Sequence, residues 1–248
     1  MILIKSQAEI ENMRIAGRAA SAALFKAGGA AAPGITTREI DAIVASALKE
    51  LGCTASFLGY NGFPASACVS INDVVIHGIP GKRIIREGDI VKLDVGAIYN
   101  GFHGDCAATF FAGKVSDTAK RLAGAVERAF YAGFKQAAAG NRVSDISAAV
   151  QASAEGEGFS VVRKFIGHGV GRSLHEDPEV PNFGKPCRGA RLEPGMTLAI
   201  EPMINEGDYD VYVAQDGWTV YTADHKLSAH FENTVLITSG QPVILTKA

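Results

Sequence analysis

The chain has 248 residues, of which 47% are hydrophobic and 20% are charged, and its formal net charge is −2. These values are typical of a globular protein and exclude a disordered chain or a strongly basic nucleic-acid-binding protein. No apolar run approaches the roughly 18 residues of a membrane span, and the apolar start is too short for a signal peptide, so we expect a cytoplasmic protein without a membrane segment.

Two capping boxes predict the first helices. The motif Ser6-x-x-Glu9 begins a helix that Pro33-Gly34 interrupts, and Thr36-x-x-Glu39 begins a second helix that ends at Gly52. Strands are expected at 67–71, 90–99 and 109–111, and further helices at about 118–139 and 144–157. The remainder is expected to be mostly strands and turns, with the last strands at 234–237 and 242–245.

The order of helix, helix and strands occurs twice along the chain. Gly34 aligns with Gly140, and Asp94 aligns with Glu201 at an offset only one residue longer. Chance similarity between amphipathic helices is the alternative, but the offset persists from helices into strands, which favours an internal duplication. We therefore expect one α+β domain, residues 1–248, in which two pseudo-symmetric halves each direct a carboxylate to a shared centre.

Four carboxylates lie in otherwise apolar strands or at the entry to one: Asp94, Asp105, Glu201 and Glu232. Any one of them is readily explained as a capping or ion-paired residue. Four together, if they converge, would repel one another and require cationic partners, and two divalent cations about 3.5–4 Å apart would balance them. His168, in a glycine-rich segment, adds one imidazole. Such an oxygen-rich set of ligands suits Mn, Fe, Co or Zn in a two-metal site, whereas a single structural zinc would prefer sulfur ligands in a closed tetrahedron.

Short motifs follow one another in a characteristic order, at residues 60–64, 70–80, 88–94, 101–105, 167–178, 200–203 and 216–220. Their order and spacing resemble those of the type I methionine aminopeptidases over essentially the whole chain. The resemblance implies the pita-bread fold, in which two pseudo-symmetric halves of helices pack on a curved antiparallel sheet. It also implies hydrolytic removal of the N-terminal methionine from nascent proteins and peptides, with a small second residue preferred, by a hydroxide that bridges two divalent cations.

The resemblance assigns the site residues one by one. It implies that two divalent cations (Co, Mn, Fe or Zn) are bound by Asp94, Asp105, His168, Glu201 and Glu232, with Asp105 and Glu232 as the bridging pair. His77 and His175 are expected to contact the substrate and act in catalysis, together with Glu201 as the proton acceptor. The pocket for the methionine side chain is expected to be lined by Tyr60, Phe63, Cys68 and Trp218.

Other positions are expected to have no direct role or depart from the family pattern. His103, His225 and His230 receive no catalytic role. Leu174 replaces a residue that is commonly aromatic, which leaves the width of the pocket open. His230 stands where Gln is common, two residues before Glu232, and would perturb the surroundings of that ligand.

Two alternatives remain. One is another pita-bread hydrolase, resembling proline dipeptidases, aminopeptidase P or creatinase, but these usually have a domain ahead of the catalytic one, and here a catalytic-domain helix already begins near Ser6. The other is a partner-binding relative without activity, which would have lost ligands. The segment between Glu201 and Glu232 leaves no room for a type II insertion, and an N-terminal zinc-binding extension is lacking, which points to the bacterial form. We expect a monomer whose partners are nascent polypeptides and, transiently, the ribosome.

Overall fold

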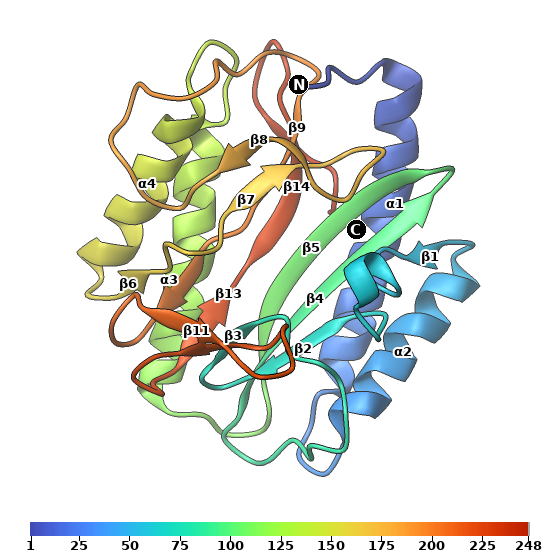
Figure 1. Ribbon diagram of the computed structural model, residues 1–248, viewed down its shortest axis with the longest axis vertical. Helices are drawn as coiled ribbons and strands as arrows, with labels where there is room; N and C mark the ends of the chain where they lie inside the picture. The colour runs from blue at the N-terminus through green and yellow to red at the C-terminus, as the bar shows by residue number, and fades with distance from the viewer. Residues whose placement is uncertain (248) are drawn as a thin grey trace.

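Four α-helices pack against a curved antiparallel sheet in the computed structural model, which describes residues 1–247 (Figure 1). They are α1 (Gln7–Ala30), α2 (Thr37–Glu50), α3 (Asp117–Gln136) and α4 (Val143–Gly156), and a short 3-10 turn, η1 (Tyr60–Gly62), follows α2. Both predicted capping boxes are formed. The Glu9 carboxylate accepts the Ser6 N–H at 2.9 Å, and the Glu39 carboxylate accepts the Thr36 N–H at 2.8 Å. The helices therefore begin where their sequences predict.

The strands form one large sheet and two small ones, and every pairing within residues 1–247 is antiparallel. The large sheet has the order β1-β4-β5-β14-β9-β7-β8, with β2 also paired to β4 and β15 to β14. The small sheets have the orders β13-β10-β6 and β11-β12-β3. The strand bounds are β1 (Thr54–Ala55), β2 (Cys68–Ile71), β3 (Val74–Ile76), β4 (Ile90–Tyr99), β5 (Phe102–Phe111), β6 (Ser160–Val161), β7 (Gly167–Gly169), β8 (Glu176–Val180), β9 (Thr197–Ile200), β10 (Met203–Asn205), β11 (Val211–Val213), β12 (Val220–Thr222), β13 (Ser228–His230), β14 (Glu232–Leu236) and β15 (Val243–Ile244).

The predicted strands differ from the structure most at β5, and the strand expected at 234–237 is also shifted, to Glu232–Leu236. The strand expected at 109–111 begins at Phe102, and β4 and β5 pair without interruption from Tyr99↔Phe102 to Ile90↔Phe111. Asn100 and Gly101 have positive φ and form the tight turn between them. The glycine and polar residues at the start of β5 resemble a loop in sequence, but pairing with β4 along its whole length extends the strand.

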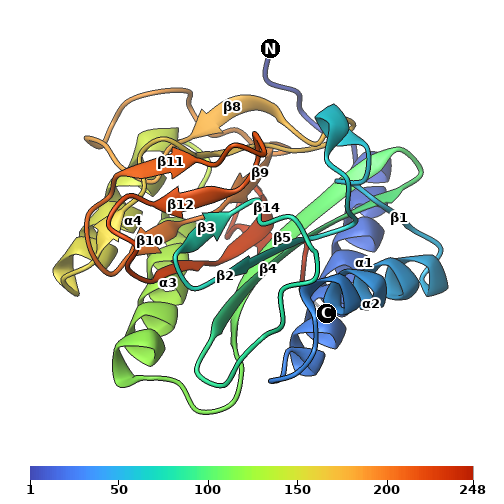
Figure 2. The ribbon, with the colours of Figure 1, turned by 60° about the horizontal axis from the view of Figure 1, so that its bottom comes forward.

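Two halves of similar construction share the large sheet, as the duplication predicted. In Figure 1, α1 and α2 lie on the right and α3 and α4 on the left, with the strands between them, and Figure 2 shows strands above α1, α2 and α3. Each half has its own apolar core, one around Leu24 and Leu93 and the other around Phe130 and Leu198. The halves meet where β5 pairs with β14. Among the described residues, no helix combines the length and apolar character needed to cross a bilayer.

Candidate metal centre and adjoining cavity

Strand register places two of the predicted ligands in one row across the sheet. Successive side chains of a strand point to opposite faces, so Asp94 faces away from the helix-side core that contains Leu93 and Val95. Asp94 is paired with Ala107, and Ala107 is paired with Glu232. Because directly paired residues point to the same face, the small Ala107 leaves space between two carboxylates.

A second row lies beside the first. The Asp105 N–H donates to Thr234 Oγ1 at 2.9 Å, Thr234 is paired with Ala199, and Ala199 is paired with His168. Glu201 directly follows the end of β9 on the same side as Ala199. The pairing of β5, β14, β9 and β7 therefore brings residues from both halves of the chain to one place.

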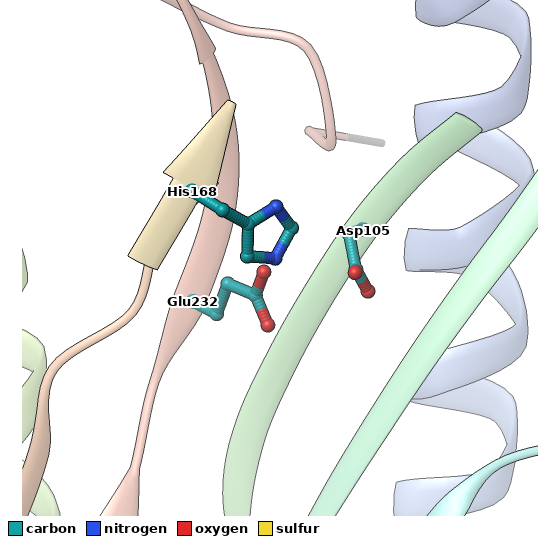
Figure 3. A group of neighbouring side chains, drawn as sticks. All are labelled: Asp105, His168 and Glu232. Carbon is teal, nitrogen blue, oxygen red and sulfur yellow. The ribbon is translucent and has the colours of Figure 1, made fainter. Parts of the chain in front are cut away.

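The side chains of Asp105, His168 and Glu232 point toward one another (Figure 3). One ligand atom from each lies within 4.8 Å of the others, and His168 Nε2 lies 3.4 Å from Glu201 Oε1. The Nδ1–H of His168 donates to the Gly169 carbonyl oxygen at 2.8 Å. That hydrogen bond assigns the proton to Nδ1 and leaves the Nε2 lone pair facing the carboxylates, which is how metal-binding histidines are commonly held.

The carboxylates are buried without a compensating cation. Burial and the neighbouring negative charges raise the pKa values of Asp94, Glu201 and Glu232 well above the usual range, and burial raises the pKa of Asp105 to about 7. Within residues 1–247, neither Lys nor Arg forms an ion pair with any of them. Asp94 Oδ1, Asp105 Oδ1 and Glu232 Oε1 are buried and have no hydrogen-bond partner. Such unsatisfied oxygens and uncompensated charge fit divalent cations.

One cavity of about 210 Å³ contains every residue that the sequence predicted for the site. Its lining comprises the five predicted ligands, the two predicted catalytic histidines and the four predicted pocket residues: Asp94, Asp105, His168, Glu201, Glu232, His77, His175, Tyr60, Phe63, Cys68 and Trp218. Phe57, Asn61 and Leu174 complete it. The acidic cluster and an apolar wall thus line the same cavity.

The apolar wall is built from side chains of separate segments. The rings of Phe63 and Trp218 meet edge to face with centroids 5.1 Å apart. Burial raises the pKa of the Cys68 thiol, which keeps it neutral, and Leu174 packs in the same cluster. Phe57 also belongs to this cluster, and sequence reasoning missed it. Its position in the motif-bearing segment just before Tyr60 was the available signal.

The two predicted catalytic histidines have different surroundings. The Tyr60 Oη lies 2.6 Å from His175 Nδ1, and the centroids of the His175 and His168 rings are 4.2 Å apart. His77 has a positive φ of 57° and contacts Trp218 with its ring. Burial, with a smaller effect of the His175 charge, lowers the pKa of His77 to about 4, and burial lowers that of His175. Tyr60, predicted as a pocket wall, therefore also contacts a predicted catalytic group.

The remaining histidines separate into two kinds. His103 is hydrogen-bonded to Ser56 at 2.9 Å and does not line the cavity, whereas His225 lies near the surface 3.2 Å from Asp73. His230 differs from both. Its buried Nε2 lies 3.8 Å from a carboxylate oxygen of Glu201 and 3.9 Å from one of Glu232. The sequence analysis gave it no catalytic role but, from its place two residues before Glu232, expected it to perturb the surroundings of that ligand, and these distances place it beside Glu232 and Glu201.

Comparisons with known proteins agree with this geometry. The profile of metallopeptidase family M24 matches residues 11–239. A methionine aminopeptidase from Clostridium perfringens is 51% identical over 246 residues, which are 99% of this chain and 99% of that protein. The crystal structure of a methionine aminopeptidase from Thermotoga maritima matches with a TM-score of 0.98 and 44% identity over 100% of both chains. A prolidase from Pyrococcus furiosus shares the fold, with a TM-score of 0.78 and 24% identity over 99% of this chain and 65% of that one.

These likenesses confirm the expected pita-bread fold. They also favour the methionine aminopeptidases over the alternative of a proline dipeptidase or another pita-bread hydrolase. The likeness to the methionine aminopeptidase spans both chains completely, whereas the prolidase is longer and less similar. The chain therefore belongs to metallopeptidase family M24 and, within that family, to the methionine aminopeptidases.

Proposed function

We propose that this chain hydrolyses the peptide bond after an N-terminal methionine whose neighbour is small, and that residues 1–248 act as one catalytic domain. One observation carries the proposal: a single cavity of about 210 Å³ has an acidic cluster on one side and a sulfur- and aromatic-lined wall on the other. Such a cavity can hold an unbranched apolar side chain while its peptide bond lies at the acidic cluster. The pairing of β5 with β14, which brings together Asp105 and Glu232 from opposite halves, supports a single domain.

Membership in a metallopeptidase family implies divalent metal binding. We assign two cations, drawn from Mn, Fe, Co and Zn, to Asp94, Asp105, His168, Glu201 and Glu232. The four negative carboxylates then balance the charge of two divalent cations, and the one imidazole makes this set of ligands suitable for borderline metals. When bound, the cations would polarise the scissile carbonyl, attract the free amino group and lower the pKa of the attacking water.

The protein's own groups would then manage protons and developing charge. Glu201, at the end of β9 and at the cavity wall, would accept the proton that the attacking water loses. We assign Tyr60 Oη–H as the donor to His175 Nδ1, an arrangement in which the neutral imidazole has its proton on Nε2. That N–H would stabilise charge as it develops on the carbonyl oxygen, and His77 would hold the leaving amide and assist its protonation.

The apolar wall would select the first residue of the substrate. Methionine is unbranched, so it fits between irregular side chains, and its sulfur interacts favourably with aromatic edges. Phe63 and Trp218 supply two aromatic rings to the cavity lining, and the uncharged Cys68 and Leu174 side chains line it beside them. The nascent polypeptide supplies the substrate. We further propose a cytoplasmic monomer with a transient association with the ribosome.

Peptide assays test the proposed reaction. The metal-free chain, reloaded with each divalent cation in turn, should cleave Met-Ala-Ser and leave Ala-led and Xaa-Pro peptides intact. Cleavage of Xaa-Pro peptides with rejection of Met-Ala-Ser would favour the prolidase-like alternative. Absence of cleavage under all metals would favour a partner-binding relative.

Two histidine variants test the assigned roles. His168→Ala should lose metal as well as turnover, because it removes a proposed ligand. His175→Ala should keep two metals but lower the rate about 10²–10⁴-fold, with a smaller change in substrate affinity, because its interaction strengthens as charge develops. Metal analysis beside steady-state kinetics decides the matter. Loss of metal from His175→Ala, or near-normal turnover with full metal, would show that its assigned role is wrong.

A further inference from the structure

His230 presents a second imidazole to the acidic cluster. The residue ends β13 and is only 1% exposed. Its backbone is fixed on both sides: it pairs with Met203 of β10, and its carbonyl oxygen accepts a hydrogen bond from Thr109 Oγ1 at 2.9 Å. The side-chain Nε2 is nevertheless buried without a hydrogen-bond partner. A buried polar atom on a fixed backbone requires a partner that the side chains around it do not supply.

The distances around this nitrogen differ from those of hydrogen bonds. His230 Nε2 lies 3.8 Å from Glu201 Oε2 and 3.9 Å from Glu232 Oε2. N–H···O hydrogen bonds have lengths of about 2.7–3.2 Å, so neither contact is one. Two ligand atoms that are each about 2.1 Å from one cation are about 3.4 Å apart at a tetrahedral angle and about 3.8–3.9 Å apart at 130–135°. Both distances from His230 Nε2 therefore fall in the range expected between two ligand atoms of a shared ion.

The Glu201 carboxylate lies between two imidazoles. Its Oε1 is 3.4 Å from His168 Nε2, and its Oε2 is 3.8 Å from His230 Nε2. Ligand atoms of Glu201, His230 and Glu232 all lie within 4.8 Å of one another, as do those of Asp105, His168 and Glu232. Each of these two groups contains one imidazole, and they share Glu232.

We propose that His230 is an additional metal ligand, which holds a divalent cation together with Glu201 and Glu232. The inference rests on the metal centre of the proposed function and adds a sixth ligating residue to it. The centre then contains two nitrogen ligands in place of one. Imidazole suits Zn, Co and Fe better than Mg or Mn, so His230 shifts the selectivity of this centre toward the former metals.

The test counts imidazoles at the metal and measures affinity. The full chain and its His230→Gln variant are stripped with a chelator, loaded with two equivalents of Zn²⁺, and studied by X-ray absorption and by competition with a chromophoric chelator. His103→Gln is the matched control, because His103 is also a buried histidine of this structure but bonds to Ser56 away from the cavity. We expect an average of one imidazole per zinc in the wild type and in His103→Gln, and about half of that in His230→Gln. The Kd of the weaker zinc should rise in His230→Gln by at least the 10–100-fold that loss of an outer partner of a ligand causes.

Different results separate this inference from the proposed function. A wild-type protein with two bound zinc ions and half an imidazole per zinc would overturn the assignment of His230 and leave the proposed function intact. An unchanged Kd in a folded His230→Gln variant would overturn it as well. A wild-type protein that binds no divalent cation would overturn both. Since the imidazole count of the wild type needs no variant, a misfolded His230→Gln does not prevent a decision.

Discussion

The segment that contains His175 is held by a buried ion pair whose removal should destabilise the protein. Lys5 Nζ lies 2.6 Å from Glu176 Oε2, and the two side chains are only 5% and 6% exposed. Glu176 Oε1 also accepts the Ser173 N–H at 3.1 Å. The pair therefore joins the residues ahead of α1 to the turn that presents His175.

Replacing Lys5 by Met keeps most of the side-chain volume and leaves the Glu176 carboxylate buried without its cation. Breaking one side of a buried pair costs about 3–5 kcal/mol. For a chain of this size each kcal/mol lowers Tm by about 2–4 °C, so Lys5→Met should lower Tm by about 6–20 °C. The value of kcat for a methionyl peptide should fall too, because the turn before Glu176 loses a restraint on His175.

Circular dichroism melts of the metal-loaded protein measure the effect. The control is Lys26→Met, because Lys26 forms a pair of similar length, 2.8 Å, with Glu50 but both side chains are more than half exposed, 51% and 60%. Such screened pairs contribute little, so this variant should melt close to the wild type. Lys5→Met combined with Glu176→Gln should recover part of the loss, since no buried charge then remains unpaired. Equal melting of Lys5→Met and Lys26→Met would refute the reasoning.

Three further predictions concern the cavity. Metal removal should lower Tm more at pH 8 than at pH 5. Burial raises the pKa values of the carboxylates, to about 7 for Asp105, so the folded metal-free protein binds more protons than the unfolded chain. The metal-free protein therefore loses stability as the pH rises through that value. A chelated protein whose Tm equals that of the loaded one at both pH values would contradict this. Phe63→Ala should weaken the binding of methionyl peptides by roughly 1–3 kcal/mol, seen in KM, and an unchanged preference for Met over Leu would count against the pocket assignment. Tyr60→Phe should lower kcat by up to about tenfold with little change in KM, since it removes one hydrogen bond to His175, and an effect on KM alone would indicate a packing role.

Local features of the fold follow closely from sequence, whereas several contacts at the site do not. The Ser6 and Thr36 capping boxes and the apolar run at 90–99 specify their elements within a residue, because the signals lie in neighbouring positions. The start of β5 was missed because its pairing with β4, and not its composition, makes it a strand.

The missed contacts all join residues far apart in the chain. The Lys5–Glu176 pair and the bond between Tyr60 and His175 exist only after the β7–β8 segment has folded against the first half. Periodicity and motif spacing contain no signal for them. The place of His230 near Glu201 likewise depends on how β13 pairs with β10.

The parts of the site differ in how freely they can change. The proposed ligands lie on or next to strands of the large sheet, where ladder hydrogen bonds and cross-strand partners on both sides limit any adjustment. Tyr60, Leu174 and Trp218 come from connecting segments outside the strands. An inhibitor whose affinity comes only from binding the metal would act similarly on many relatives of this chain. Selectivity is better sought in groups that reach Leu174 and Trp218, which lie on connecting segments, and the same segments are where new substrate preferences can arise without a change to the proposed ligands.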